Sequence, residues 1–260
     1  MKKKYLVILL VIIPTIFLNV HATEQLTVWV ENYPPFGYEI EGEIQGLSTD
    51  VTREILKRAK IQAESWRIAA WKDAYKITLN RPNSLLYTVV RKPDREDKFH
   101  WIGPIADRRV YLYKVTNMSG NVIKDLNSLE DVKKYGYTIG AVEKTAAAEY
   151  YKRMGVHVET VKNYYQNILK LHLGRIDLIS AVEPHFNYLV KKHGLKLDNF
   201  AKALMDDNSK KYYIAVNLKT DSKIVQSLQS AFKTIQDDGT LQRIQHKHLH
   251  EEYSLGSMTK

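Results

Sequence analysis

Hydrophobic residues along the chain recur at two spacings, and stretches with each spacing alternate. Residues 25–30 form a short, continuous apolar run that is typical of a buried strand. Residues 49–60 instead place Val51, Ile55 and Leu56 on one helical face. Because the alternation continues towards the end of the chain, it predicts an α/β protein in which helices separate the strands.

The remaining elements follow from the same spacings. Further strands are predicted at 62–66, 85–90, 110–115, 137–142, 157–161, 178–182 and 212–217. Helices are predicted at 71–79, 129–134, 146–154, 164–173 and 184–193, and a long closing helix at 222–248. The middle block has its own series of strands and helices, so segments 106–113 and 207–215 are interpreted as crossings between two lobes. Lobe 1 is expected to comprise 23–107 and 214–260, and lobe 2 to comprise 108–213.

The first residues follow a different pattern. Three lysines at positions 2–4 precede an apolar run at 5–18, and a small-residue cleavage signal follows at 20–22. This order predicts a secretory signal peptide at 1–22 that is cleaved after Ala22, and a mature protein in the periplasm. An uncleaved membrane anchor is the alternative, although the run is short for crossing a bilayer.

Composition narrows the class of protein. At 260 residues with 44% hydrophobic side chains, the chain is long enough for two lobes with separate cores. It has no cysteine, which excludes disulfides, a thiolate metal site and a lipid-modified cysteine. Without the signal peptide, 36 Lys and Arg stand against 29 Asp and Glu, a formal charge of +7 that favours anionic ligands. The charges are scattered and the chain is expected to be secreted, so no nucleic-acid partner is expected.

The segment ENYPPFGY, residues 31–38, directly follows the first predicted strand. In open α/β sheets the carboxyl ends of strands are where ligands bind. Pro34 and Pro35 fix their own backbone φ angles and make a stiff exit that can hold Tyr33 and Phe36 in a defined place. The alternative is that both rings merely pack beneath the following loop.

Five segments in order resemble the family 3 extracellular solute-binding proteins, periplasmic receptors for polar amino acids that feed ABC importers. ENYPPFGY with GLSTDV at 46–51 is similar to the opening of that family. The others are KPDRE at 92–96 with FHWIGPI at 99–105, DLNSLEDV at 125–132 with TIGAV at 138–142, GRIDLI at 174–179, and DDGTL at 237–241. The resemblance implies a two-lobed periplasmic-binding-protein fold of type II, in which two hinge strands let the lobes close on a small ligand.

The resemblance also implies ligand-binding residues. Arg95 matches an arginine that binds the α-carboxylate of the ligand, a task suited to the planar, charged guanidinium fork. Phe36 and Trp71 match aromatic residues that sandwich the ligand body, and Tyr33 lies beside them. Thr145 falls at a helix start, where its hydroxyl and nearby N–H groups could hold the same carboxylate.

Each of these positions has an alternative interpretation. Trp71 could pack against lobe 1 at the start of a helix. Arg95 could form a surface salt bridge with Glu96 or Asp97. Thr145 could be an ordinary N-cap, a role that can coexist with ligand binding.

The chain also departs from the pattern of the family. Lys92 replaces a threonine or serine, which would make the site more positive and would suit a second carboxylate. Val182 replaces the aspartate that normally accepts the ligand ammonium, and Glu183 follows it. If Glu183 turns towards the ligand it could take over ammonium binding; if it does not, the ligand could lack an α-amino group.

The resulting prediction is a monomeric, non-enzymatic receptor that delivers a small polar solute, an amino acid or an acidic relative, to an ABC transporter permease. No cofactor is expected, and no metal site at the histidine-rich segment 246–250. One alternative is a periplasmic enzyme similar to cyclohexadienyl dehydratases, with Glu183 as general acid. The other is a sensory protein that docks on a membrane receptor.

Overall fold

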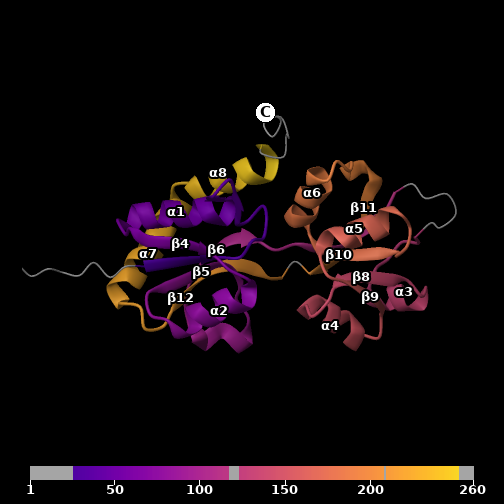
Figure 1. Ribbon diagram of the computed structural model, residues 1–260, viewed down its shortest axis with the longest axis horizontal. Coiled ribbons are helices and arrows are strands. Elements are labelled where there is room, and N and C mark those ends of the chain that lie inside the picture. Colours follow the sequence, from indigo (N-terminus) through magenta and orange to yellow (C-terminus); the bar gives the residue numbers. More distant parts are fainter. Residues whose placement is uncertain (1–25, 117–122, 208, 252–260) are drawn as a thin grey trace, which may run out of the picture.

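The computed structural model describes residues 26–116, 123–207 and 209–251. The predicted signal peptide and its cleavage site lie outside these residues. Two five-stranded sheets, each with helices on both faces, form two lobes that lie side by side (Figure 1). Within the described residues, no helix has both the length and the apolar character needed to cross a membrane.

The first lobe contains the first and last segments of the described chain. Its sheet has the order β4-β1-β5-β12-β6, in which β1 pairs in parallel with β4 and β5, and β12 runs antiparallel to β5 and β6. Its strands are β1 Leu26–Val30, β4 Ala63–Ile68, β5 Ser84–Val90, β6 Phe99–Asp107 and β12 Lys211–Asn217. Its helices are α1 Leu47–Ala59, α2 Trp71–Asn80, α7 Ser222–Asp237 and α8 Thr240–His246, with the π-helical turn η3 Lys247–Glu251.

Strand β1 is buried on both faces, which explains its unbroken apolar sequence. Val28 and Val30 face the core beneath α1, where they meet residues such as Val51. Trp29 points to the opposite face and packs in a second cluster with Ala74 of α2. The sheet is therefore enclosed between α1, α7 and α8 on one side and α2 on the other (Figure 1).

The second lobe repeats this plan with different helices. Its sheet has the order β11-β7-β10-β8-β9, made of β7 Val110–Val115, β8 Thr138–Val142, β9 His157–Val161, β10 Leu178–Val182 and β11 Phe200–Asp207. Helices α5 Tyr164–His172 and α6 Glu183–Lys192 cover one face, and α3 Leu129–Lys134 and α4 Ala146–Arg153 cover the other. There are also two short 3-10 turns, η1 Pro93–Lys98 in the first lobe and η2 Leu197–Asn199 in the second.

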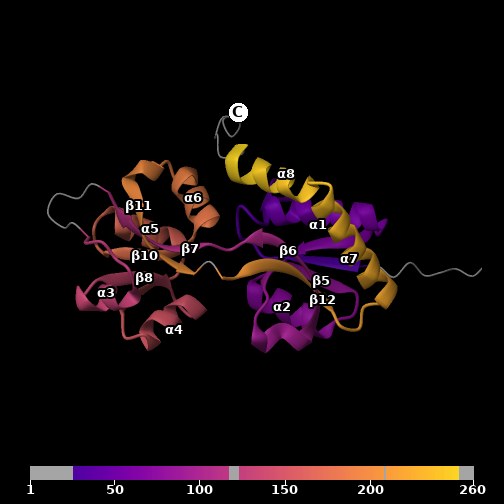
Figure 2. The same ribbon diagram turned by 180° about the vertical axis from the view of Figure 1, so that it is seen from behind.

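The chain passes between the sheets twice, from β6 to β7 and from β11 to β12 (Figure 2). Arg108, in the first crossing, forms an ion pair of 3.0 Å with Asp207 at the end of β11. The boundary expected between residues 213 and 214 falls inside β12, which pairs within the first sheet from Lys211 onward. We therefore propose that the second lobe boundary lies between Asp207 and Lys211.

The predicted α/β, two-lobed fold is confirmed. The prediction of one long closing helix at 222–248 is wrong, because two helices occupy this segment. Helix α7 ends at Asp237, and α8 begins at Thr240. Gly239 between them has φ of 76°, a left-handed conformation that glycine adopts without the steric cost of a side chain. The apolar spacing continues through this break, so periodicity alone could not reveal it.

Four short or irregular strands were not predicted. The hairpin of β2 Tyr38–Ile40 and β3 Glu43–Gln45 is too short to show alternation. Strand β6 contains Gly103 and Pro104, but as the edge strand of its sheet it tolerates a residue without a backbone donor. Strand β11 is also an edge strand, and its start lies outside the predicted crossing segment.

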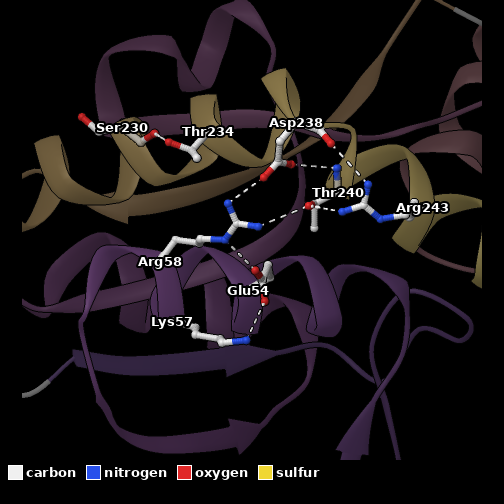
Figure 3. Close-up of polar contacts among 8 residues, drawn as sticks. All are labelled: Glu54, Lys57, Arg58, Ser230, Thr234, Asp238, Thr240 and Arg243. Atoms are coloured by element: carbon white, nitrogen blue, oxygen red, sulfur yellow. Dashed lines mark hydrogen bonds and ion pairs between the residues drawn. The ribbon is translucent and has the colours of Figure 1, made fainter.

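A network of polar side chains joins α1 to the turn between α7 and α8 (Figure 3). Arg58 on α1 donates to Glu54 and to Asp238, both at 2.7 Å. Asp238 also accepts from the backbone N–H of Thr240 at 2.9 Å, and Arg243 donates to the Thr240 hydroxyl at 2.6 Å. The turn at Gly239 is thus held to α1 by charge-assisted hydrogen bonds.

Asp238→Asn should destabilise the protein at neutral pH. It should also make the stability of the protein depend less on pH in the acid range. Hydrogen bonds from Thr240 and Arg58 hold the pKa of Asp238 well below its usual range. A depressed folded-state pKa gives stability that is present above the unfolded pKa and is lost as pH falls through the folded pKa. Melting curves between about pH 2 and pH 7 should therefore converge for wild type and Asp238→Asn at the acid end. Asp237→Asn, which affects only the surface pair with Lys233, is the control, and equal slopes for all three proteins would contradict this account.

Candidate functional site

The candidate site is built from strand ends that face each other across the two lobes. The loop after β1 reaches the second lobe, because the carbonyl oxygen of Pro34 accepts a hydrogen bond of 2.6 Å from Nδ1 of His185 on α6. Helix α6 directly follows the carboxyl end of β10. Since β1 and β5 are parallel, as are β8 and β10, the carboxyl ends of these four strands point into the region between the lobes.

A group of aromatic rings occupies one part of this region. The Tyr33 ring lies 4.4 Å from the His185 ring and stacks on Phe36 at 5.5 Å. Tyr164, the first residue of α5, meets His185 edge-on at 5.0 Å, and Tyr212 of β12 meets Phe36 at 4.9 Å. Burial lowers the pKa of His185 to about 4, so its ring is neutral at physiological pH and its Nδ1 carries a single donor proton. The first lobe is therefore held against α6 by a hydrogen bond and stacked rings.

Phe36 is buried in the first lobe, and its contact with a ligand stays a prediction. Its side chain is 1% exposed and belongs to the main core of the first lobe. The ring stacks on Tyr33 and also borders a pocket beside the first crossing. The alternative considered for Phe36, packing beneath the following loop, matches its position.

Arg95 and Trp71 lie together in a second group. The Arg95 guanidinium carbon is 5.1 Å from the ring centres of both Trp71 and Tyr75. Its Nη1 donates to the carbonyl oxygen of Val90, the last residue of β5, at 3.2 Å. The side chain is therefore positioned between two aromatic rings and a strand end, a setting in which a guanidinium is favoured.

Neither of the two salt bridges considered for Arg95 is formed. Glu96 is bound by Arg91 instead, with Nε of Arg91 at 2.8 Å from Oε2 of Glu96. Within the described residues no ion pair involves Arg95. The charge of Arg95 helps to lower the pKa of Asp94, but the Arg95 fork can accept a carboxylate without first breaking an ion pair.

Lys92 and Thr145 have local partners. Lys92 occupies the N-cap position of η1, and its Nζ lies 3.3 Å from Oδ2 of Asp94. The carbonyl oxygen of Lys92 accepts a hydrogen bond of 2.9 Å from the Arg95 backbone N–H. Thr145 is the N-cap of α4: its hydroxyl donates to the Val142 carbonyl at 2.7 Å and accepts from the Ala148 N–H at 3.3 Å. The N-cap interpretation of Thr145 is confirmed. No hydrogen bond, ion pair or ring contact of the described residues joins Thr145 to the other predicted site residues.

Glu183 is already engaged by two cations. Its carboxylate forms an ion pair with Lys202 of β11, and the other oxygen lies 3.5 Å from Nε of Arg109 in the crossing segment. Its side chain is only 16% exposed. Binding of a ligand ammonium by Glu183 would require these pairs to separate.

A pocket lies beside the first crossing, between α6 and the end of α8. The pocket shows that a gap remains between the two lobes near the hinge. Neither Arg95 nor Trp71 lines this pocket. Its lining combines apolar side chains with the charges of the crossing: Phe36, Leu47, Ala106, Asp107, Arg109, Pro184, Gln245 and Leu249.

Several residues of the interlobe region were not predicted from the sequence. Glu31 begins the ENYPPFGY segment and is half-buried, and Arg108, Tyr164, His185 and Tyr212 come from other elements. Only Glu31 had a local signal, a carboxylate directly after a buried strand. The other four are brought to this place by the packing of separate strands and helices.

Candidate metal ligands do not cluster in the described part of the chain: no group of three or more His, Cys, Asp or Glu side chains there could hold a metal ion. His248, in the histidine-rich segment, is 3% exposed, and its Nε2 lies 2.8 Å from Oδ2 of Asp50 on α1. This histidine packs onto the first lobe and does not extend into solvent.

Two α/β lobes, two crossings and polar groups at facing strand ends define a two-lobed binding protein. Residues 26–251 match the profile of the bacterial extracellular solute-binding proteins, family 3, and the chain belongs to this family. Its function is therefore that of a solute-binding protein.

One curated protein is similar in sequence, and two solved structures are similar in fold. The L-cystine-binding protein TcyA of Bacillus subtilis (strain 168) is 26% identical over 237 residues, which cover 88% of this chain and 82% of TcyA. An ancestral arginine-binding protein bound to glutamine superposes with a TM-score of 0.68 and 21% identity, over 89% of this chain and all of that one. A histidine kinase sensor domain with similarity to periplasmic binding proteins has a TM-score of 0.71 and 16% identity, over 87% and 96% of the two chains.

Proposed function

We propose that this protein is a periplasmic receptor that binds a free amino acid between its lobes and delivers it to an ABC transporter permease. The observation that carries the proposal is the Arg95 guanidinium, which lies between Trp71 and Tyr75 and has no carboxylate partner among the described residues. A planar cation in this position matches the carboxylate of an amino acid. The names of the relatives, which include cystine, arginine and glutamine as ligands, support this class of solute.

Five of the seven predicted residues have a role in this proposal. Arg95 holds the α-carboxylate through two parallel hydrogen bonds, and Trp71 forms a wall against the ligand body. Lys92 adds positive charge at the same strand end. Thr145 brings the N-terminus of α4, with its free N–H groups, towards the carboxylate as the lobes close. Tyr33 stays at the interlobe contact with His185, where it limits the size of the site.

Binding is expected to shift the balance between open and closed lobes. A ligand that contacts both lobes only in the closed state stabilises that state by its differential affinity. The closed form then docks on the permease as a monomer. Export by a signal peptide that is cleaved after Ala22 would bring the protein to the periplasm.

The two alternative functions have no specific observation in their favour. A dehydratase would need a cleft carboxyl group as general acid, whereas Glu183 is paired with Lys202 and Arg109. A sensory role shares the fold of the histidine kinase sensor domain, but at 16% identity that likeness concerns the fold alone. The proposal is therefore a transport receptor that is not an enzyme.

Thermal unfolding of residues 23–260 against the common L-amino acids, dicarboxylates and small organic anions tests the proposal. An amino acid at a hundredfold its dissociation constant should raise the free energy of unfolding by about 2.7 kcal/mol. That corresponds to a shift of several degrees in the melting temperature. A shift with organic anions alone would contradict the assignment to amino acids, and the absence of any shift would contradict a receptor for these solutes.

A further inference from the structure

The hydroxyl group of Tyr151 joins helix α4 to the end of strand β11 inside the second lobe. Tyr151 is 1% exposed, and its hydroxyl donates to Oδ2 of Asp206 at 2.6 Å. Oγ of Ser180, a buried residue of β10, lies 2.7 Å from the same hydroxyl oxygen. This polar contact therefore connects three elements that are far apart in the sequence, among the apolar side chains beneath α3 and α4.

Asp206 reaches this contact from a β-bulge. Met205 pairs with Tyr111 of β7 and Asp207 pairs with Val110, so Asp206 is an extra residue between them. Such an extra residue bends the strand and re-aims a side chain. The bulge lies directly before the second crossing, because β11 ends at Asp207.

The contact between Tyr151 and Asp206 has a cost for folding. Burial raises the pKa of Asp206, so the ionised carboxyl group is less favoured here than in water. Burial also raises the pKa of Tyr151, and the Asp206 carboxylate raises it further, so the phenol stays protonated and remains a donor. Apolar side chains at both positions would fill the same space without desolvating a charge. Packing of α4 alone therefore does not account for this pair.

The residue after Asp206 connects the two crossings. Asp207 accepts a hydrogen bond of 3.0 Å from Nη1 of Arg108 and one of 2.7 Å from Nζ of Lys210. The backbone N–H of Arg108 also donates to the carbonyl oxygen of Lys210 at 3.3 Å. Two successive carboxylates at the end of β11 thus have different partners: Asp206 is bound inside the second lobe, and Asp207 is bound within the hinge.

We propose that Tyr151 is a positioning residue: its hydrogen bond to Asp206 fixes helix α4 to the start of the second crossing and sets the angle at which the second lobe leaves the hinge. This inference rests on the proposed function, in which Thr145, the N-cap of the same helix, approaches the ligand carboxylate. A hinge rotation moves a lobe as one unit only if the elements beside the hinge are fixed to that lobe. Loss of the Tyr151 hydroxyl should therefore broaden the range of lobe orientations.

The first test measures the distance between the lobes in protein without ligand. Because the chain has no cysteine, Lys57→Cys on α1 and Glu130→Cys on α3 give two unique, exposed sites for spin labels. Double electron–electron resonance should show a distance distribution about twice as wide for Tyr151→Phe as for the labelled wild type. Tyr150→Phe, which removes an exposed hydroxyl from the same helix, should leave the distribution unchanged.

A variant at the acceptor tests the same contact from its other side. Asp206→Ala should widen the distribution as Tyr151→Phe does, and the double variant should be no wider than either single one, since all three lack the same interaction. If Tyr151→Phe does not fold, Asp206→Ala decides the question. Distributions as narrow as that of wild type overturn the proposal even where the melting temperature falls, because a hydroxyl with only a structural role would lower stability alone.

Ligand binding separates this inference from the proposed function. The probes are L-cystine, L-glutamine and L-arginine, each in isothermal titration calorimetry. Tyr151→Phe should bind the amino acid that wild type binds about tenfold more weakly, because fewer molecules hold α4 in the closed arrangement. Tyr150→Phe should bind it as wild type does. An unchanged Kd for Tyr151→Phe overturns its positioning role, whereas a wild type that binds none of the probes overturns the proposed function for these ligands and leaves the distance distributions to decide the role of Tyr151.

Discussion

Replacing Arg95 with alanine should weaken binding of the amino acid found in the thermal screen by about 100-fold or more. Truncating one partner of a desolvated, hydrogen-bonded charge pair costs about 2–5 kcal/mol, which is a factor of roughly 30 to several thousand in Kd. The Arg95 guanidinium, which lies between Trp71 and Tyr75, is the cation that we assign to the ligand carboxylate. Isothermal titration calorimetry measures this directly.

Two further variants make the result specific. Arg95→Lys keeps the positive charge but loses the fork, so its affinity should lie between those of wild type and Arg95→Ala. Arg91→Ala removes the neighbouring guanidinium, which binds Glu96 and lies over Trp101, and should change Kd less than about threefold. If Arg95→Ala still binds within threefold of wild type, Arg95 does not hold the carboxylate.

Phe36→Ala should lower the free energy of unfolding by about 3–5 kcal/mol, in the absence of any ligand. The ring is 1% exposed, stacks on Tyr33 and meets Tyr212 edge-on, so truncation leaves a cavity in the main core. Urea denaturation followed by tryptophan fluorescence gives the value from the shift of the midpoint. A residue that only contacted ligand would instead change Kd and leave unfolding unaltered.

The control for Phe36 is Trp71→Ala. Trp71 is half-buried at the start of α2, beneath the Arg95 guanidinium. Its removal should cost less stability than the removal of Phe36 but should weaken ligand binding more. The reverse order, with Trp71 more important for folding and Phe36 for binding, would favour the ligand contact that the sequence predicted for Phe36.

How much could be predicted differs between the fold and the site. Apolar spacing placed most helices and strands to within a few residues, because burial of one face dictates a local pattern. It joined α7 to α8 because the spacing continues across Gly239, and it missed β6 and β11, which lie at sheet edges and have weak patterns. The motif order then indicated the two-lobed family.

The site residues could be predicted from the sequence only in part. Arg95 and Trp71 could be proposed because the segments that contain them resemble a known pattern, and the structure places these two side chains together. Phe36 and Glu183 were assigned by their place in a motif, but their surroundings are non-local: Phe36 packs against Tyr212, and Glu183 pairs with Lys202. Sequence spacing does not encode which distant residue will fill a gap or neutralise a charge.

The sequence by itself determined the α/β class, the order of most elements, and the presence of an arginine suited to a carboxylate. These depend on local propensity, on burial of one face, and on the chemistry of a single side chain. Only the tertiary structure decided which strand ends meet, that His185 bonds to Pro34, and that Glu183 pairs with Lys202. Those features depend on contacts between residues far apart in the chain, and their energies arise only when both lobes are assembled.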